Sequence, residues 1–134
     1  MRRTGGVLFA ALVLFAAGAI ACDCSRPSLA GSTAQASVIL VAKITAFEPL
    51  QRVTLQPVEV LKGQAGKSLA IPTGQSDCDY FLPPNNPKVG EAFLLFLESS
   101  NGRLVASRCT VSGRVAERTE ELRALRKGFK PGRQ

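Results

Sequence analysis

The sequence predicts an all-β domain, a small barrel of five strands with a packing helix at its C-terminal end, stapled by disulfides. Three observations support this prediction. Short apolar segments with strand-like alternation follow one another between turn residues. After Gly113 the apolar residues recur at helical spacing instead. The four cysteines are an even number in a short chain, which is typical of a disulfide framework.

The first 21 residues have the three parts of a secretory signal peptide. Met1-Arg2-Arg3 is cationic, residues 7–17 are apolar, and Ala19-Ile20-Ala21 is a small-residue cleavage site. We expect cleavage after Ala21, which makes Cys22 the first residue of a secreted or periplasmic protein. A retained membrane anchor is the alternative, but glycines dilute the apolar stretch and no basic cluster follows it.

Cleavage leaves enough chain for one compact domain and too little for two. We expect this domain over residues 22–128 and a loose basic tail over residues 129–134. The net charge of +7 is concentrated in the leader and after Gly113. Aromatic residues do not interleave with these charges as a nucleic-acid groove would require, so we predict no nucleic-acid partner.

Histidine is absent from the chain, which excludes Ser-His-Asp triads, Cys-His pairs and imidazole metal sites. Asp77 and Asp79 flank Cys78, but residues two apart in a loop point in different directions. We therefore interpret them as solvated carboxylates. The sequence predicts no enzyme, no catalytic residue, no cofactor and no bound metal ion.

The first strand is predicted over residues 37–47, where strict alternation of β-branched residues indicates one fully buried face. That face is Val38, Leu40, Ala42, Ile44 and Ala46. In the second strand, over residues 52–61, the apolar positions change parity after Pro57. This change predicts a bulge, with Pro57 on an unpaired edge. A turn over residues 62–67 leads to a short third strand over residues 68–72.

Residues 74–90 hold prolines that forbid regular structure, so we expect a long loop tethered by Cys78. Residues 92–97 are all apolar, as in a central strand covered on both sides. Asn101-Gly102 predicts a hairpin turn, followed by a strand over residues 104–109.

Two segments outside these strands are not predicted to be strands: one is a connecting segment and the other a helix. Residues 26–36 are interpreted as a connecting segment with one short helical turn opening at Ser28. Val115, Leu122, Leu125 and Phe129 indicate a helix of three to four turns that ends near Gly128. Together the elements fit a five-stranded OB-type barrel with an accessory helix best.

Four cysteines allow three pairings. A bridge between Cys22 and Cys24 would strain the disulfide geometry and is disfavoured. The two remaining pairings both close large loops, each contributing about 4 kcal/mol in the chain-entropy model. The residues themselves do not decide between these two pairings.

The arrangement Cys22-x-Cys24-x-x-Pro27, Val58-x-Val60-x-Lys62-Gly63, Cys78 and Cys109 resembles the netrin-like module. It is most similar to the inhibitory domain of the tissue inhibitors of metalloproteinases and its bacterial relatives, over nearly all of the mature chain. This resemblance implies an OB barrel with Cys22 bonded to Cys78 and Cys24 bonded to Cys109.

In the animal inhibitors, the α-amine and carbonyl of the first cysteine bind the zinc of the protease. The resemblance therefore implies that Cys22, with Asp23 and Cys24 beside it, is directed at a protease zinc. An α-amine has a pKa of about 7.7 to 8.0, so a useful fraction is neutral near neutral pH and can donate a lone pair. The expected partner is a protein, namely a zinc metalloprotease, and we expect the chain to be a monomer.

Three other functions stay open at this point. The chain could be a non-inhibitory adaptor of the cell envelope, with Cys22 and Cys24 purely structural. It could be a lipoprotein with Cys22 lipidated, since Ala19-Ile20-Ala21-Cys22 loosely resembles a lipobox, and only then would it contact a membrane. Lipidation would leave one of the other cysteines unpaired. A redox Cys-x-Cys motif is the third.

Overall fold

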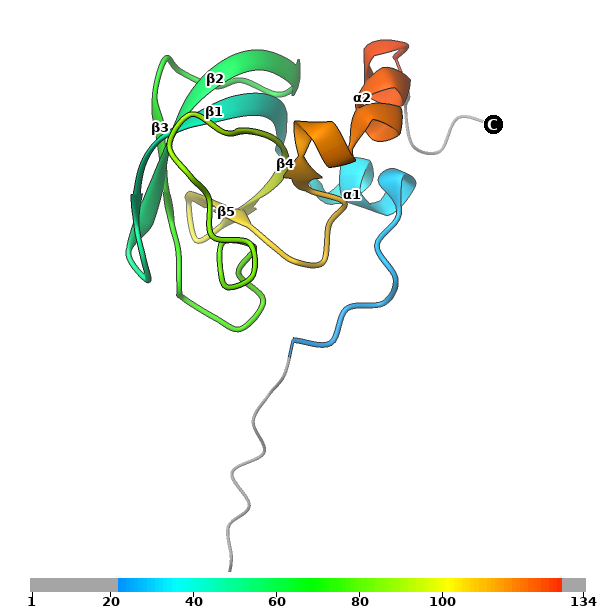
Figure 1. The fold of residues 1–134 in the computed structure, drawn as a ribbon. Helices are drawn as coiled ribbons and strands as arrows, with labels where there is room; N and C mark the ends of the chain where they lie inside the picture. The colour runs from blue at the N-terminus through cyan, green and yellow to red at the C-terminus, as the bar shows by residue number, and fades with distance from the viewer. Residues whose placement is uncertain (1–21, 129–134) are drawn as a thin grey trace, which may run out of the picture.

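The computed structural model describes residues 22–128, and its main feature is a curved antiparallel sheet that almost closes into a barrel (Figure 1). The strands are β1 (Val38–Glu48), β2 (Arg52–Lys62), β3 (Leu69–Pro72), β4 (Ala92–Ser100), β5 (Arg103–Ala106) and the two-residue β6 (Gly113–Arg114). Their order is β3-β2-β1-β4-β5, with β6 paired to β4. The outer strands β3 and β5 lie beside each other. The predicted all-β barrel of the five-stranded OB type is confirmed.

The hairpin between β4 and β5 forms where it was predicted. Asn101 and Gly102 have φ angles of 50° and 76°, the left-handed region that this dipeptide tolerates. The last strand is shorter than expected, because the chain leaves the sheet after Ala106. Ser107 instead makes an isolated bridge with Asp79 of the long loop.

The pairing of β1 with β2 contains three register shifts, which curve both strands. One shift falls between Val41, which pairs with Glu59, and Ala42, which pairs with Pro57, so Val58 is the extra residue. The predicted bulge beside Pro57 is therefore confirmed. Strand β3 pairs with β2 only over residues 52–55, so Pro57 has no strand on its outer side within the described chain.

The core has two layers, one inside the barrel and one between the barrel and the helices. The inner layer includes Leu40, Ala42, Ile44, Val53, Leu55, Ile71, Phe81, Phe93, Leu95 and Leu97. The outer layer includes Ala36, Ile39, Val41, Leu94, Phe96, Leu122 and Leu125. The prediction of a single buried face on β1 is wrong for its first half, because the helices cover Ile39 and Val41. Ala46 is exposed because a register shift precedes it.

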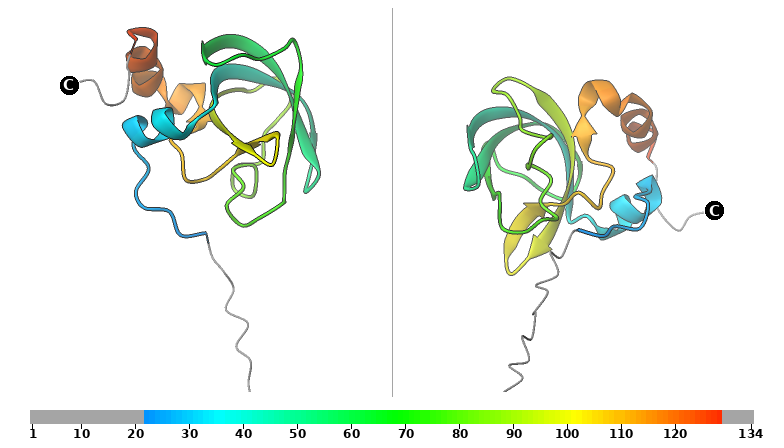
Figure 2. Two further views of the ribbon diagram at one scale, coloured as in Figure 1. Left: turned by 180° about the vertical axis from the view of Figure 1, so that it is seen from behind. Right: turned by 60° about the horizontal axis from the view of Figure 1, so that its bottom comes forward.

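Both helices lie on the same side of the barrel (Figure 2). The first, α1 (Leu29–Gln35), is longer than the single turn expected before Gly31. Its N-terminus is capped by the Ser28 hydroxyl, which accepts a hydrogen bond from the Gly31 N–H at 3.0 Å. Burial of Ser32 and Thr33 against the domain extends the helix beyond what the local sequence indicates.

The second helix is shorter than predicted. A 3-10 turn, η1 (Val115–Glu117), precedes α2 (Thr119–Arg126), and Arg118 between them has non-helical angles. The apolar residues at helical spacing from Val115 onward therefore belong to two elements, η1 and α2, and both pack into the outer layer of the core. The expected end near Gly128 is confirmed by the positive φ of 82° at that residue, and Phe129 lies outside the described residues.

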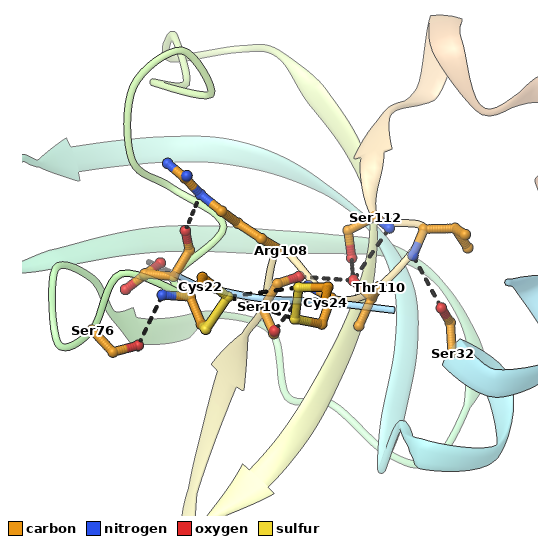
Figure 3. The surroundings of a disulfide bond; sticks show 12 residues. Cys22, Cys24, Ser32, Ser76, Ser107, Arg108, Thr110 and Ser112 are labelled. Atoms are coloured by element: carbon orange, nitrogen blue, oxygen red, sulfur yellow. Dashed lines mark hydrogen bonds between the residues drawn. A yellow bond between two sulfur atoms is a disulfide. The ribbon is translucent and has the colours of Figure 1, made fainter. Parts of the chain in front are cut away.

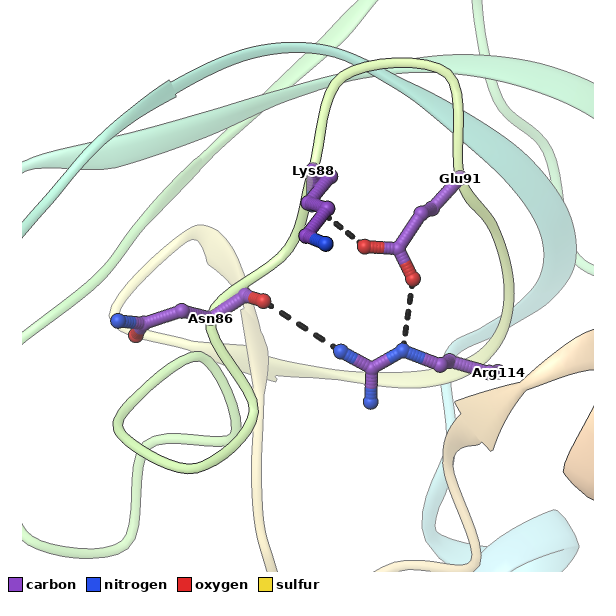
Figure 4. A network of polar contacts seen from close by, with 4 residues as sticks. All are labelled: Asn86, Lys88, Glu91 and Arg114. Carbon is purple, nitrogen blue, oxygen red and sulfur yellow. Dashed lines mark hydrogen bonds and ion pairs between the residues drawn. The ribbon is translucent and has the colours of Figure 1, made fainter.

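An ion pair closes the end of the long loop (Figure 4). Glu91 accepts a hydrogen bond from Arg114 Nε at 2.7 Å and another from the Lys88 N–H at 2.7 Å. The guanidinium of Arg114 also lies 5.3 Å from the centre of the Phe93 ring. The hydrogen bond from Arg114, and secondly that from Lys88, lower the pKa of Glu91.

We expect Glu91→Gln to lower the melting temperature at neutral pH, because the charged form of Glu91 is the one that these donors stabilise. A lowered pKa stabilises the fold above the ordinary glutamate value, and this contribution disappears as the pH falls through the lower folded value. The difference from the parent protein should therefore shrink below about pH 4.5. Thermal melts from pH 7 to pH 3 measure it.

Glu120→Gln is the matched control. Glu120 pairs with Arg123 at 3.0 Å, but both side chains are largely exposed, so this pair should contribute little at any pH. A Glu91→Gln protein whose melting curve matches that of Glu120→Gln throughout would contradict the stabilising role of Glu91.

Candidate functional site

The N-terminal strap, defined as residues 22–28, runs in extended form across the surface to α1. Two disulfides fix it to the barrel: Cys22 is bonded to Cys78, and Cys24 is bonded to Cys109 (Figure 3). This is the pairing that the resemblance implied. The side chain of Asp23 between the two bridges is exposed, while both cysteines are half-buried. The strap is thus tied to two parts of the chain that are far apart in sequence.

The two disulfides lie against each other. Cys22 Sγ is 3.6 Å from both Cys24 Sγ and Cys109 Sγ. The sulfurs of Cys22, Cys78 and Cys109 lie within 4.8 Å of one another, a separation compatible with metal ligands. Thiolates bind zinc, however, and every one of these sulfurs is already bonded to another sulfur. The cluster is therefore a covalent anchor and not a metal site.

Each distal cysteine is held by a serine two residues before it. Ser76 Oγ accepts a hydrogen bond from the Cys78 N–H at 3.2 Å, and Ser107 Oγ accepts one from the Cys109 N–H at 3.0 Å. Such side-chain bonds fix a turn where no strand partner is present. Sequence reasoning missed both serines, although the repeated Ser-x-Cys spacing is visible in the sequence.

The segment after Cys109 is bonded to β4 and to α1. Thr110 and Ser112 share a hydroxyl hydrogen bond of 2.8 Å, and Ser112 Oγ accepts from the Phe96 N–H at 2.9 Å. The Val111 N–H donates to Ser32 Oγ at 3.0 Å. These bonds fix the segment that follows the Cys24–Cys109 bridge to β4 and α1.

Asp79 corrects the prediction of two solvated loop carboxylates. Asp77 is exposed as expected, but Asp79 is only 6% exposed. Its carboxylate accepts hydrogen bonds from the Gly74 N–H at 2.7 Å and the Phe81 N–H at 3.1 Å. Loop N–H groups that enter the core need an acceptor, and no strand supplies one here. Asp79 is therefore a structural residue.

Aromatic side chains add a second anchor to the same loop, beside the predicted tether at Cys78. Tyr80 and Phe81 are buried. Their rings contact each other edge to face, with centres 5.0 Å apart, and both contact Phe93 of β4 in the same way at 6.1 and 5.6 Å. Arg108 also bonds the loop, donating from Nε to the Asp79 carbonyl at 3.1 Å. The loop surface beside the strap is consequently fixed at several points.

Comparisons with known proteins name no relative, because no family model and no curated protein matches this sequence. Two disulfides without a free cysteine are typical of an oxidising extracellular or periplasmic compartment. Within residues 22–128, none of the helices has the length and apolar character needed to span a membrane. The predicted leader and its cleavage site lie outside the described residues.

Proposed function

We propose that this protein is an exported binding module, similar to the netrin-like domain of metalloproteinase inhibitors, that inhibits a zinc metalloprotease through the free amine of Cys22. One observation carries the proposal: the disulfides of Cys22 and Cys24 lock the strap on both sides of the exposed Asp23. A signal peptide cut after Ala21 would make Cys22 the first residue of this rigid segment.

The chemistry follows from the terminal position. A neutral α-amine and the carbonyl of the same residue form a five-membered chelate, which can replace water at the open position of a catalytic zinc. The two bridges restrict the chelate before binding, which lowers the entropy lost on association. Because the amine must be neutral, inhibition should strengthen as the pH rises through about 7.7 to 8.0.

Asp23 sets the kind of protease that fits. Its carboxylate would enter the pocket next to the zinc, and burying an unpaired charge costs several kcal/mol. The target pocket therefore needs a cationic side chain that can pair with Asp23. Asp23→Asn should weaken inhibition of such a protease and strengthen inhibition of one with a neutral pocket.

The test compares residues 22–134 with the same protein carrying one extra alanine before Cys22, against a panel of purified zinc metalloproteases. The extra residue converts the amine into an amide, so the inhibition constant should increase at least about 100-fold. The melting temperature and both disulfides should remain unchanged. Equal inhibition by the two forms would contradict zinc binding by the terminus.

The alternatives predict other outcomes of the same experiment. An adaptor would bind its partner equally well with and without the extra residue. A lipoprotein would show a diacylglycerol increment in the intact mass once the chain is expressed together with its leader. The Cys22–Cys78 bridge argues against lipidation, because the thioether would require the sulfur that Cys78 now holds.

A further inference from the structure

We propose that a pocket beside the Cys24–Cys109 bridge binds a carboxylate, namely an acidic side chain of a partner protein. The pocket has a volume of about 330 Å³ and is lined by Tyr80, Arg108, Thr110, Ser112, Glu117 and Arg118, among others. Nothing in the zinc-directed role of Cys22 requires this pocket, so the two proposals can fail independently.

The first observation is that two fixed arginines in this pocket are not neutralised. Arg108 donates to the carbonyls of Asp79 at 3.1 Å and Pro83 at 3.0 Å. Arg118 donates to the carbonyl of Val111 at 2.8 Å. Carbonyl oxygens orient a guanidinium but do not cancel its charge, and each guanidinium keeps further N–H donors.

The positions of the acidic side chains also show that Arg108 and Arg118 are not neutralised. All ten lie within the described residues, because neither the first 21 nor the last six residues contain Asp or Glu. Four of them form ion pairs, and their partners are Arg52, Arg114, Arg123 and Arg126. The pocket arginines therefore have no carboxylate partner among the described side chains.

Local packing holds Arg118 in place. A Cβ atom at Gly113 would lie 2.7 Å from Arg118 Nε, so a side chain at position 113 would force Arg118 to shift. A guanidinium fixed in advance loses little entropy when it binds a carboxylate. The geometry is therefore suited to ligand binding without rearrangement.

Tyr80 supplies a donor that the fold does not use. Its ring is buried in the inner layer, and its hydroxyl makes no hydrogen bond to another described residue. Burial raises the pKa of Tyr80, so the hydroxyl keeps its proton at neutral pH. The hydroxyls of Thr110 and Ser112, in contrast, already bond each other and the backbone.

The charge of the lining selects the ligand class. Arg108 and Arg118 contribute two positive charges, and the Glu117 carboxylate at the same pocket contributes one negative charge. One positive charge in excess matches a singly charged carboxylate, which arginine binds through paired hydrogen bonds. A phosphate dianion would leave one negative charge beside Glu117, so the same lining disfavours it.

The position of the pocket favours a protein as the source of the carboxylate. Arg108 and Thr110 flank Cys109, and Pro27 of the strap also lines the pocket. A protein seated on the strap would therefore place its own side chains near this pocket. A free small carboxylate has the same chemistry and serves as the simplest probe.

The test is a titration of the ¹⁵N-labelled mature protein, followed by NMR at constant ionic strength. The probes are sodium acetate, a hexapeptide of glutamate, sodium phosphate and sodium chloride. We expect saturable chemical-shift changes at the amides of Thr110, Ser112 and Arg118 with acetate and with the peptide, and at least tenfold tighter binding of the peptide.

Tighter binding of phosphate than of acetate would overturn the assignment of the ligand as a carboxylate. Peptide binding no tighter than that of acetate would overturn the proposal that the carboxylate comes from a protein. Shifts that do not saturate with either probe would overturn the pocket itself.

Three variants locate the binding. Arg118→Gln should weaken peptide binding at least tenfold, whereas Arg123→Gln, on the exposed face of α2, should leave it unchanged. Tyr80→Phe keeps the buried ring and should weaken binding about threefold, which reports on the pocket even if Arg118→Gln is unstable. Equal weakening by the Arg118 and Arg123 substitutions would show attraction to surface charge alone and would overturn the proposal.

Discussion

Replacing Cys24 and Cys109 together by alanine is expected to lower the free energy of unfolding by about 4.5 kcal/mol, because the bridge closes a long loop in the unfolded chain. The two residues are 85 positions apart in sequence. A loss of this size is a large part of the stability of a small domain. Urea denaturation, with the slope of the transition compared between variants, measures it.

The Cys22→Ala/Cys78→Ala variant is the comparison, since its loop of 56 positions predicts a similar loss of about 4 kcal/mol. The two variants should differ in function, because only this second one removes the bridge of the terminal residue itself. If either pair could be removed at a loss below 1 kcal/mol, the bridges would not be what holds the strap to the barrel.

Phe81→Ala is expected to lower the free energy of unfolding by about 3 to 5 kcal/mol, although Phe81 belongs to a loop. Its side chain is 1% exposed and contacts the rings of Tyr80 and Phe93. Truncation would leave a cavity under the loop that carries Cys78. Urea denaturation and hydrogen exchange of the loop amides both test this expectation.

Val89→Ala is the matched control in the same loop. Val89 is 69% exposed, so its truncation should change the free energy of unfolding by less than about 0.5 kcal/mol. Phe81→Leu should fall between the two, because it restores part of the lost volume. Similar losses for Phe81→Ala and Val89→Ala would mean that the loop is not anchored in the core.

Sequence patterns predicted the sheet well because the spacing of apolar residues along a strand depends on which of its faces are buried. Alternation identified β1, a continuous apolar run identified β4, and the parity change beside Pro57 located a bulge that the structure contains. The patterns could not show which outer residues the helices would cover. Ile39 and Val41 are buried by α2 and the segment before β1, and that contact is a tertiary property.

The candidate site was only partly predictable. The cysteines were visible in the sequence, and the resemblance supplied their pairing, but charge and loop position alone suggested that Asp79 was solvated. Its burial depends on backbone N–H groups of the same loop, which no side-chain pattern reveals. The Ser-x-Cys repeat was a usable local signal, because a hydroxyl two residues before an N–H commonly caps a turn.

The second half of β2 pairs with β1 but has no strand on its outer edge within the described chain, and this has a consequence for behaviour at high concentration. Val58 and Val60 are 59% and 42% exposed there, and an apolar edge strand normally templates the addition of a strand from another molecule. Pro57 offers no N–H, and the register shifts bend the backbone out of a regular ladder. Glu59, which forms an ion pair with Arg126 at 2.7 Å, adds charged side chains to the same edge of the sheet. Together these features oppose the addition of a strand from another molecule along this edge of the sheet.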